Sequence, residues 1–82
     1  MSKLKLSPAQ SDVIRKMREG GQLIRRSGVM WFLRDEWGGL LNYISKATGE
    51  SLMRLNIIKF KQWHGSVSEI FILTDLGKEI EL

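Results

Sequence analysis

The residues with the clearest chemical potential in this chain lie between positions 59 and 68. Two lysines, one tryptophan and two serines occur there at nearly alternate positions: Lys59, Lys61, Trp63, Ser66 and Ser68. Ammonium groups neutralise phosphates, hydroxyls donate to phosphate oxygens, and an aromatic ring can stack on a base or a sugar. The pattern predicts a nucleic-acid-contacting surface; the alternative is a solvated strand face whose lysines deter edge pairing.

A β-hairpin would bring these side chains onto one face. A two-residue turn is expected at His64 and Gly65, and antiparallel partners count outward from a turn. The expected pairs are Trp63 with Ser66, Lys61 with Ser68 and Lys59 with Ile70. The other face would then carry the apolar side chains of Ile58, Phe60, Val67 and Phe71.

A second set of charged residues lies at helical spacing. Lys46, Glu50 and Arg54 are four residues apart and share one face of a predicted helix. In a DNA reader, Arg54 could reach guanine in the major groove and Lys46 a phosphate. The alternative is a solvated face, because Glu50 precedes Arg54 in the favoured ion-pair orientation. Arg25 and Arg26 are adjacent in a predicted strand, so at most one can join the basic surface of the hairpin.

Catalytic and metal chemistry has little support in this sequence. The chain has one histidine, His64, and no cysteine, which removes disulfides, zinc ribbons and thiol chemistry. The adjacent carboxylates Asp35 and Glu36 lack the opposed geometry of an acid–base pair. We therefore expect a non-enzymatic protein without a cofactor.

The elements that must position these residues begin with a helix. Ser7 can cap it, Pro8 suits its first position and Gln10 can close a capping box, which predicts a helix over 8–19. Its expected core residues are Ala9, Val13, Ile14 and Met17. Residues 22–26, 29–34 and 40–44 are predicted strands, with a two-residue turn at 27–28. A helix over 29–37 is the alternative to the second strand.

The second half of the chain is also predicted to contain a helix, strands and a further helix. Ser45 is expected to cap a helix whose Leu52 and Leu55 reach the core. Asn56 can take the left-handed conformation that closes a helix, after which a strand begins at 57–58. Thr74 and Asp75 are expected to cap a last helix that runs to about residue 81.

Composition predicts one small domain. The chain has 82 residues, of which 43% are hydrophobic and 27% charged, and a net charge of +4. We expect a single domain over 1–82 with a flexible segment at 1–6, and an α+β fold in which a helix, a β-hairpin or meander, a helix, a hairpin and a short C-terminal helix follow one another. No run is long enough to span a bilayer, so we expect a cytoplasmic protein without a membrane partner.

Three segments carry a family resemblance. They are residues 6–10, which open the first helix, Ser45 to Ile58, and residues 71–78. They resemble the winged-helix superfamily, and more narrowly small winged-helix-like proteins of bacteria and their prophages, which share the ending found here at Leu73, Thr74, Gly77 and Lys78. The chain departs from the pattern over 22–44, where strands replace the usual second helix.

The resemblance implies a helix in the major groove, here Lys46 to Leu55, and a wing on the backbone, here Lys59 to Ser68. The implied partner is duplex DNA, and the implied role is a small transcriptional regulator, as monomer or homodimer. Single-stranded nucleic acid on Trp63 is a variant of this hypothesis. The alternative function is a protein-interaction or inhibitory module of phage or mobile-element origin, using exposed Trp37 and Trp63.

Overall fold

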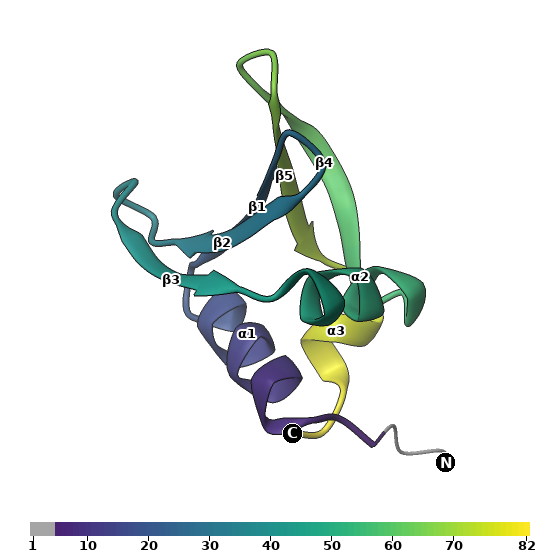
Figure 1. Cartoon of the computed structure of the whole chain (residues 1–82). Coiled ribbons are helices and arrows are strands. Elements are labelled where there is room, and N and C mark those ends of the chain that lie inside the picture. The colour runs from purple at the N-terminus through teal and green to yellow at the C-terminus, as the bar shows by residue number, and fades with distance from the viewer. Residues whose placement is uncertain (1–4) are drawn as a thin grey trace.

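The computed structural model describes residues 5–82 as a small α+β domain with three helices and one five-stranded antiparallel sheet (Figure 1). The elements are α1 (Pro8–Arg18), β1 (Gln22–Arg26), β2 (Met30–Arg34), β3 (Leu40–Ile44), α2 (Lys46–Arg54), β4 (Ile58–His64), β5 (Ser68–Leu73) and α3 (Asp75–Glu79). The expected order of elements is confirmed. Of the segment expected to be flexible, residues 1–4 lie outside the described residues, and Leu6 packs against the core.

Helix α1 begins with the predicted capping box. Ser7 Oγ accepts from the backbone N–H of Gln10, and Gln10 Oε1 accepts from the backbone N–H of Ser7. The helix is followed by Gly20, whose φ of +108° suits glycine. The buried stripe consists of Val13, Ile14 and Met17. Ala9 is exposed, so its expected place in the core was wrong; Leu6 packs there from the preceding segment.

Strands β1, β2 and β3 form an antiparallel meander. Arg26 pairs with Met30, which leaves a three-residue loop in place of the two-residue turn expected from the sequence. Ser27 and Gly28 both have positive φ angles, and Val29 falls outside the ladder. The alternative helix over 29–37 is excluded, because Met30–Arg34 is a strand paired on both sides.

Helix α2 and the turn after it also follow local signals. Ser45 Oγ accepts from the N–H of Thr48, and Asn56 closes the turn with φ +62°. Leu52 is fully buried, whereas Leu55 is exposed, because it lies at the C-cap instead of on the core-facing stripe. Three strands, instead of a helix, separate α1 from α2. The precise winged-helix topology is therefore not confirmed.

The β4–β5 hairpin has a different register from the expected one. His64 pairs with Ser68, so the loop has three residues, Gly65 to Val67. A β-bulge follows further down, where Phe60 pairs with Phe71 but Gln62 pairs with Ile70, which leaves Lys61 as the extra residue. An extra residue moves every later side chain of the strand to the other face of the sheet. The three pairs expected from the sequence are therefore wrong.

Helix α3 is shorter than expected and is tied to the turn after α2. Thr74 caps it, and the Thr74 hydroxyl donates to the carbonyl oxygen of Asn56 at 2.6 Å. Gly77 packs so closely on the backbone of Ile57 that an added Cβ would overlap the Ile57 carbonyl oxygen. The glycine that weakens this helix locally is thus the residue that lets it dock.

The sheet has the strand order β3-β2-β1-β5-β4, and the three helices lie on one face of it (Figure 1). The main core fills the space between that face and the helices. Its strand residues are Leu23, Trp31, Leu33, Ile58, Phe71 and Leu73, and its helix residues are Val13, Ile14, Met17 and Leu52. The other face is covered by no helix of the described chain. No helix in residues 5–82 is both long and apolar enough to cross a membrane.

Candidate nucleic-acid interface

The structure divides the predicted hairpin residues between two faces. Lys59 pairs with Ile72, and Ser68 pairs with Arg26, so the side chains of Lys59 and Ser68 lie on the helix-free face. Trp63 lies on the other face, because it pairs with Glu69 beyond the bulge. Lys61 is at the bulge and Ser66 is in the loop, both exposed. The single face expected to hold all five side chains does not form.

The predicted residues of α2 are exposed but lie away from Lys59. Lys46 Nζ is 4.0 Å from Glu50 Oε2, so Glu50 pairs with the lysine before it instead of with Arg54. Leu52 fixes α2 on the helix-covered side of the sheet. Because Lys59 lies on the opposite side, Lys46 and Arg54 do not share a sheet face with it. Both residues remain accessible at the surface.

The helix-free face, called the open face below, is defined by strand register. Its central row runs across all five strands, and the rows beside it carry most of its charge. The central row is Tyr43, Phe32, Ile24, Ile70 and Gln62, and the flanking residues include Gln22, Arg26, Met30, Arg34, Lys59, His64 and Ser68. Ile24 and Ile70 are only 2% and 3% exposed, so neighbouring side chains of the sheet cover its centre.

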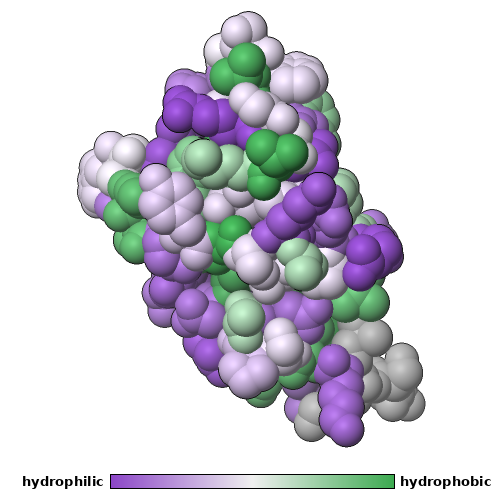
Figure 2. All heavy atoms as spheres, in the orientation of Figure 1, coloured by the Kyte–Doolittle hydropathy of each residue, from purple (hydrophilic) through white to green (hydrophobic). Residues whose placement is uncertain are grey.

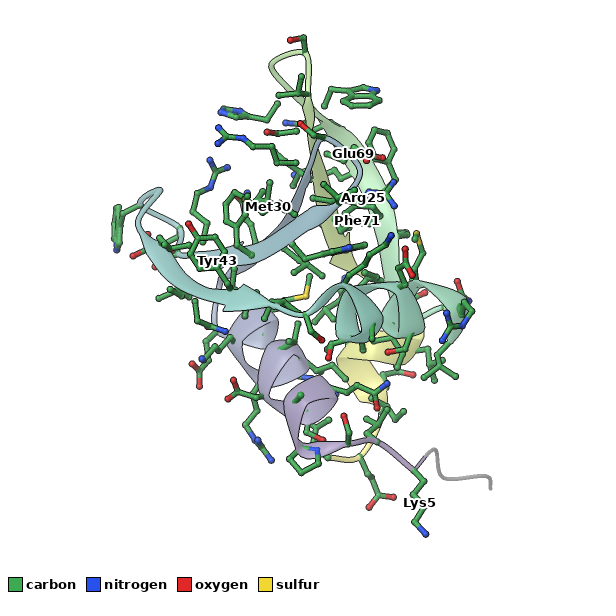
Figure 3. All side chains as sticks on the ribbon, in the orientation of Figure 1. Lys5, Arg25, Met30, Tyr43, Glu69 and Phe71 are labelled. Carbon is green, nitrogen blue, oxygen red and sulfur yellow. The ribbon has the colours of Figure 1, made fainter. Side chains whose placement is uncertain are left out.

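An aromatic pair occupies one end of the central row. The rings of Phe32 and Tyr43 are 6.2 Å apart between centroids and meet edge to face at 65°. Phe32 is half-buried, whereas Tyr43 is 65% exposed and Met30 beside them is also exposed. Figure 3 shows Met30 and Tyr43 on one side of β1 and β2, away from Phe71. The Tyr43 ring is therefore available to a ligand.

Three cations of the open face have no carboxylate partner. Arg26, Arg34 and Lys59 all lie on the open face, and none forms an ion pair with a described residue. Arg34 Nη2 donates to Gln22 Oε1 at 2.8 Å, which uses one of five guanidinium donors. No Asp or Glu occurs at an open-face position of the five strands. The face therefore has a net positive charge.

On the helix-covered face of the sheet, the charge of Arg25 is neutralised by an ion pair with Glu69. Arg25 donates from Nε and Nη2 to the two carboxylate oxygens of Glu69, at 2.7 and 2.8 Å. The guanidinium lies 5.3 Å from the Trp31 ring centroid and 5.4 Å from that of Phe71. The hydrogen bonds and charge of Glu69 hold the pKa of Arg25 above its ordinary value, with a smaller contribution from Glu50. Figure 3 shows Arg25, Glu69 and Phe71 together between the β1–β2 hairpin and β4.

Two exposed aromatic side chains, Phe60 and Trp63, also lie on this helix-covered face of the sheet. Phe60 and Trp63 lie 5.8 Å apart between ring centroids, and Phe60 also contacts Phe71 at 6.2 Å. Trp63 is 58% exposed. On the side drawn in Figure 2, the half of the molecule that carries the two hairpins shows strongly hydrophilic groups with separate hydrophobic ones between them. That side has no continuous apolar patch over the hairpins.

Sequence reasoning found part of the open face and missed the rest. Arg25 and Arg26 do point to opposite faces, as expected, and Arg26 is the one that joins Lys59 and Ser68. Phe32, Arg34 and Tyr43 were not identified. For Phe32 and Arg34 the available signal was alternation within one strand, because Met30, Phe32 and Arg34 occur at every second position of 30–34.

Other site chemistry is sparse in the described residues. No group of three or more His, Cys, Asp or Glu residues could hold a metal ion there. A cavity of about 430 Å³ between α1, β5 and α3 is lined by Met17, Arg18, Gly21, Ile72, Leu73 and Lys78, and it contains no acid–base pair. Fold and surface together define a small α+β domain with an open, positively charged sheet face. Comparison with protein-family models, curated proteins and solved structures found no match.

Proposed function

We propose that this protein is a non-enzymatic nucleic-acid-binding module whose open sheet face contacts phosphate. The observation that carries the proposal is the presence of Arg26, Arg34 and Lys59 on one face without a carboxylate. Phosphate contacts by lysine and arginine supply most of the affinity of non-specific nucleic-acid binding. Arginine adds geometric fit, because its planar fork matches phosphate oxygens.

The proposal changes the surface expected from sequence but keeps its class of ligand. Lys59 and Ser68 belong both to the predicted site and to the open face, but Ser68 is only 5% exposed, so Lys59 is the one of the two that phosphate can reach. Lys46, Lys61 and Arg54 remain predicted contacts on other parts of the surface. Mutation can separate the contribution of Lys46 and Arg54 from that of the open face, because α2 and the open face lie on opposite sides of the sheet.

The test is a titration of mixed-sequence oligonucleotides, single-stranded and duplex, at several salt concentrations. Loss of one phosphate contact lowers the slope of log K against log salt by about 0.7 to 0.9. We expect Arg26→Gln and Lys59→Gln each to lower the slope by that amount. Arg15→Gln and Lys78→Gln are the matched controls, since they remove exposed cations on α1 and α3.

Two further variants decide between the two surfaces. If Lys46→Gln and Arg54→Gln lower the slope while the open-face variants do not, contact is made through α2 and the proposed surface is wrong. If all six variants lower it equally, binding is a non-specific effect of net charge. Thermal unfolding of each variant would confirm that the fold is retained.

A second candidate function is protein binding through Phe60 and Trp63. It is favoured by the exposure of both rings beside the neutral Arg25–Glu69 pair, since aromatic residues are enriched at protein interfaces. Replacement of Trp63 by alanine would weaken the binding of a protein partner. It would leave unchanged the slope of log K against log salt for nucleic-acid binding.

A further inference from the structure

We infer that the open face takes single-stranded nucleic acid, with a base stacked on Tyr43 next to Phe32 and the adjoining phosphates at Arg26 and Arg34. This inference rests on the proposed function and specifies its ligand. Four observations carry it: the width of the sheet, the exposure of the Tyr43 ring, the positions of the two arginines and the charge of the opposite surface.

The dimensions of the sheet disfavour a duplex. Strands lie about 4.8 Å apart, so a five-stranded sheet is roughly 19 Å wide, whereas the major groove of B-DNA is about 12 Å wide and admits a helix or a two-stranded ribbon. All five strands contribute to the central row of the open face. The whole face is therefore too wide to enter the major groove, and it suits a ligand that lies on its surface.

The aromatic pair offers what a single strand needs. Bases in a duplex are stacked on each other, whereas unpaired bases can stack on a protein ring. Tyr43 is 65% exposed on edge strand β3, and its edge-to-face contact with Phe32 holds it in place. Because Phe32 is half-buried, the accessible ring of the pair is that of Tyr43, and Phe32 packs against it from the side.

The two arginines lie on either side of this platform. Arg34 follows Phe32 by two positions on β2, and Arg26 pairs with Met30, which precedes Phe32 by two positions. Residues two apart on a strand are separated by about 7 Å, so the Cα atoms of Arg26 and Arg34 lie roughly 14 Å apart along the strand direction, and the Phe32 position falls between them. A polynucleotide crossing the platform would meet a cation before and after the stacked base.

The second exposed aromatic pair is less suited to phosphate. Phe60 and Trp63 lie on the helix-covered face, where Arg25 is already bound by Glu69 and where Glu50 adds another negative charge near it. Carboxylates repel phosphates, and the Nε–Nη2 edge of the Arg25 guanidinium is already occupied by Glu69. Arg26 and Arg34, which form no ion pair with a described residue, are on the Tyr43 side.

The experiment compares binding of a fluorescein-labelled mixed-sequence 12-mer and of its duplex by anisotropy at about 150 mM salt. Stacking on one aromatic side chain corresponds to about a 5- to 150-fold effect on single-strand affinity, so Tyr43→Leu should weaken single-strand binding by a factor in that range and duplex binding little. Tyr43→Phe keeps the ring and should bind as the wild type does. Trp63→Leu, which removes an exposed ring on the other face, is the matched control.

Different outcomes of this experiment test the single-strand inference and the proposed function. If Arg26→Gln and Arg34→Gln weaken binding but Tyr43→Leu does not, or if the duplex binds as tightly as the single strand, the single-strand inference is overturned and the proposed function stands. If Trp63→Leu removes the single-strand binding instead, the platform is on the wrong face. If neither oligonucleotide binds, both the proposed function and this inference are wrong.

Discussion

Gly49 of α2 rests directly on the indole ring of Trp31 in β2, so that an added Cβ would overlap the ring atoms Cδ2, Cε2 and Cε3. Trp31 is buried and also contacts Phe71 at 5.3 Å between ring centroids. A helix that approaches a sheet this closely needs a glycine at the contact. This close approach, together with the buried Leu52, sets the position of α2, on which Lys46 and Arg54 are exposed.

The first prediction concerns that contact. Gly49→Ala should lower the free energy of unfolding by about 1 to 2 kcal/mol, because overpacking costs about 1 to 3 kcal/mol and exceeds the 0.5 to 1 kcal/mol that alanine normally gains in a helix. The measurement is urea unfolding. In a Trp31→Phe background, whose single ring is smaller than the fused indole and lacks Cε3, the cost of Gly49→Ala should fall. Equal costs in both backgrounds would show that Trp31 is not the obstacle.

The second prediction concerns the Arg25–Glu69 pair. Arg25→Met leaves a mostly buried carboxylate without its two hydrogen bonds, and we expect a loss of about 2 to 4 kcal/mol in unfolding free energy. Replacing both partners, as Arg25→Met with Glu69→Leu, should recover most of it, because no charge is then left unpaired. A double variant less stable than the single one would contradict this account.

The third prediction is the pH dependence of the same contribution. The pKa of Arg25 is raised in the folded state, so its stabilising effect is fully present below the unfolded pKa and is lost only as pH rises through the folded one. An arginine titrates above about pH 12, so the stability difference between the wild type and Arg25→Met should be constant from pH 6 to 9. Chemical unfolding at several pH values measures it. A difference that changes across this range would point to another titrating group.

The fourth prediction concerns the link between α3 and the turn after α2. Thr74→Val removes the hydroxyl that donates to Asn56 and caps Gly77, and it should cost about 1 to 2 kcal/mol. Thr74→Ser keeps the hydroxyl and serves as the control. Hydrogen exchange of the Gly77 amide should accelerate in the valine variant only. If the serine variant is the less stable of the two, the methyl packing of Thr74 matters more than its hydroxyl.

Local signals in the sequence predicted the helix boundaries well. Ser7, Ser45 and Thr74 each cap the helix that they were expected to cap, and Asn56 takes the left-handed conformation. These contacts join residues at most four positions apart, so the side-chain type largely determines them. The order of helices and strands follows from such signals together with the branched and aromatic content of the strands.

The open face depends on a contact that no local pattern encodes. Strand β1 pairs with β5, which brings Arg26 next to Ser68 across more than half of the chain. The sequence indicated that Arg26 would lie on one face of its strand, but the neighbouring strand could not be identified from alternation alone. For the same reason Tyr43 and Phe32 could not be recognised as the end of a row that crosses the whole sheet.

The bulge at Lys61 explains the largest error in the sequence-based register, and it yields the last prediction. Because Lys61 is the extra residue, its deletion should leave Phe60 opposite Phe71 and Gln62 opposite Ile70, and should change the unfolding free energy by no more than about 1 kcal/mol. Deletion of Lys59 is the control: it would move either Ile58 or Phe60 to the wrong face and should cost about 3 kcal/mol or more, as the loss of a buried side chain does. Thermal unfolding and the cross-peak between the Phe60 and Trp63 rings measure both effects. If removing Lys61 is as harmful as removing Lys59, or abolishes that cross-peak, the bulge lies elsewhere and Trp63 belongs on the face with Lys59.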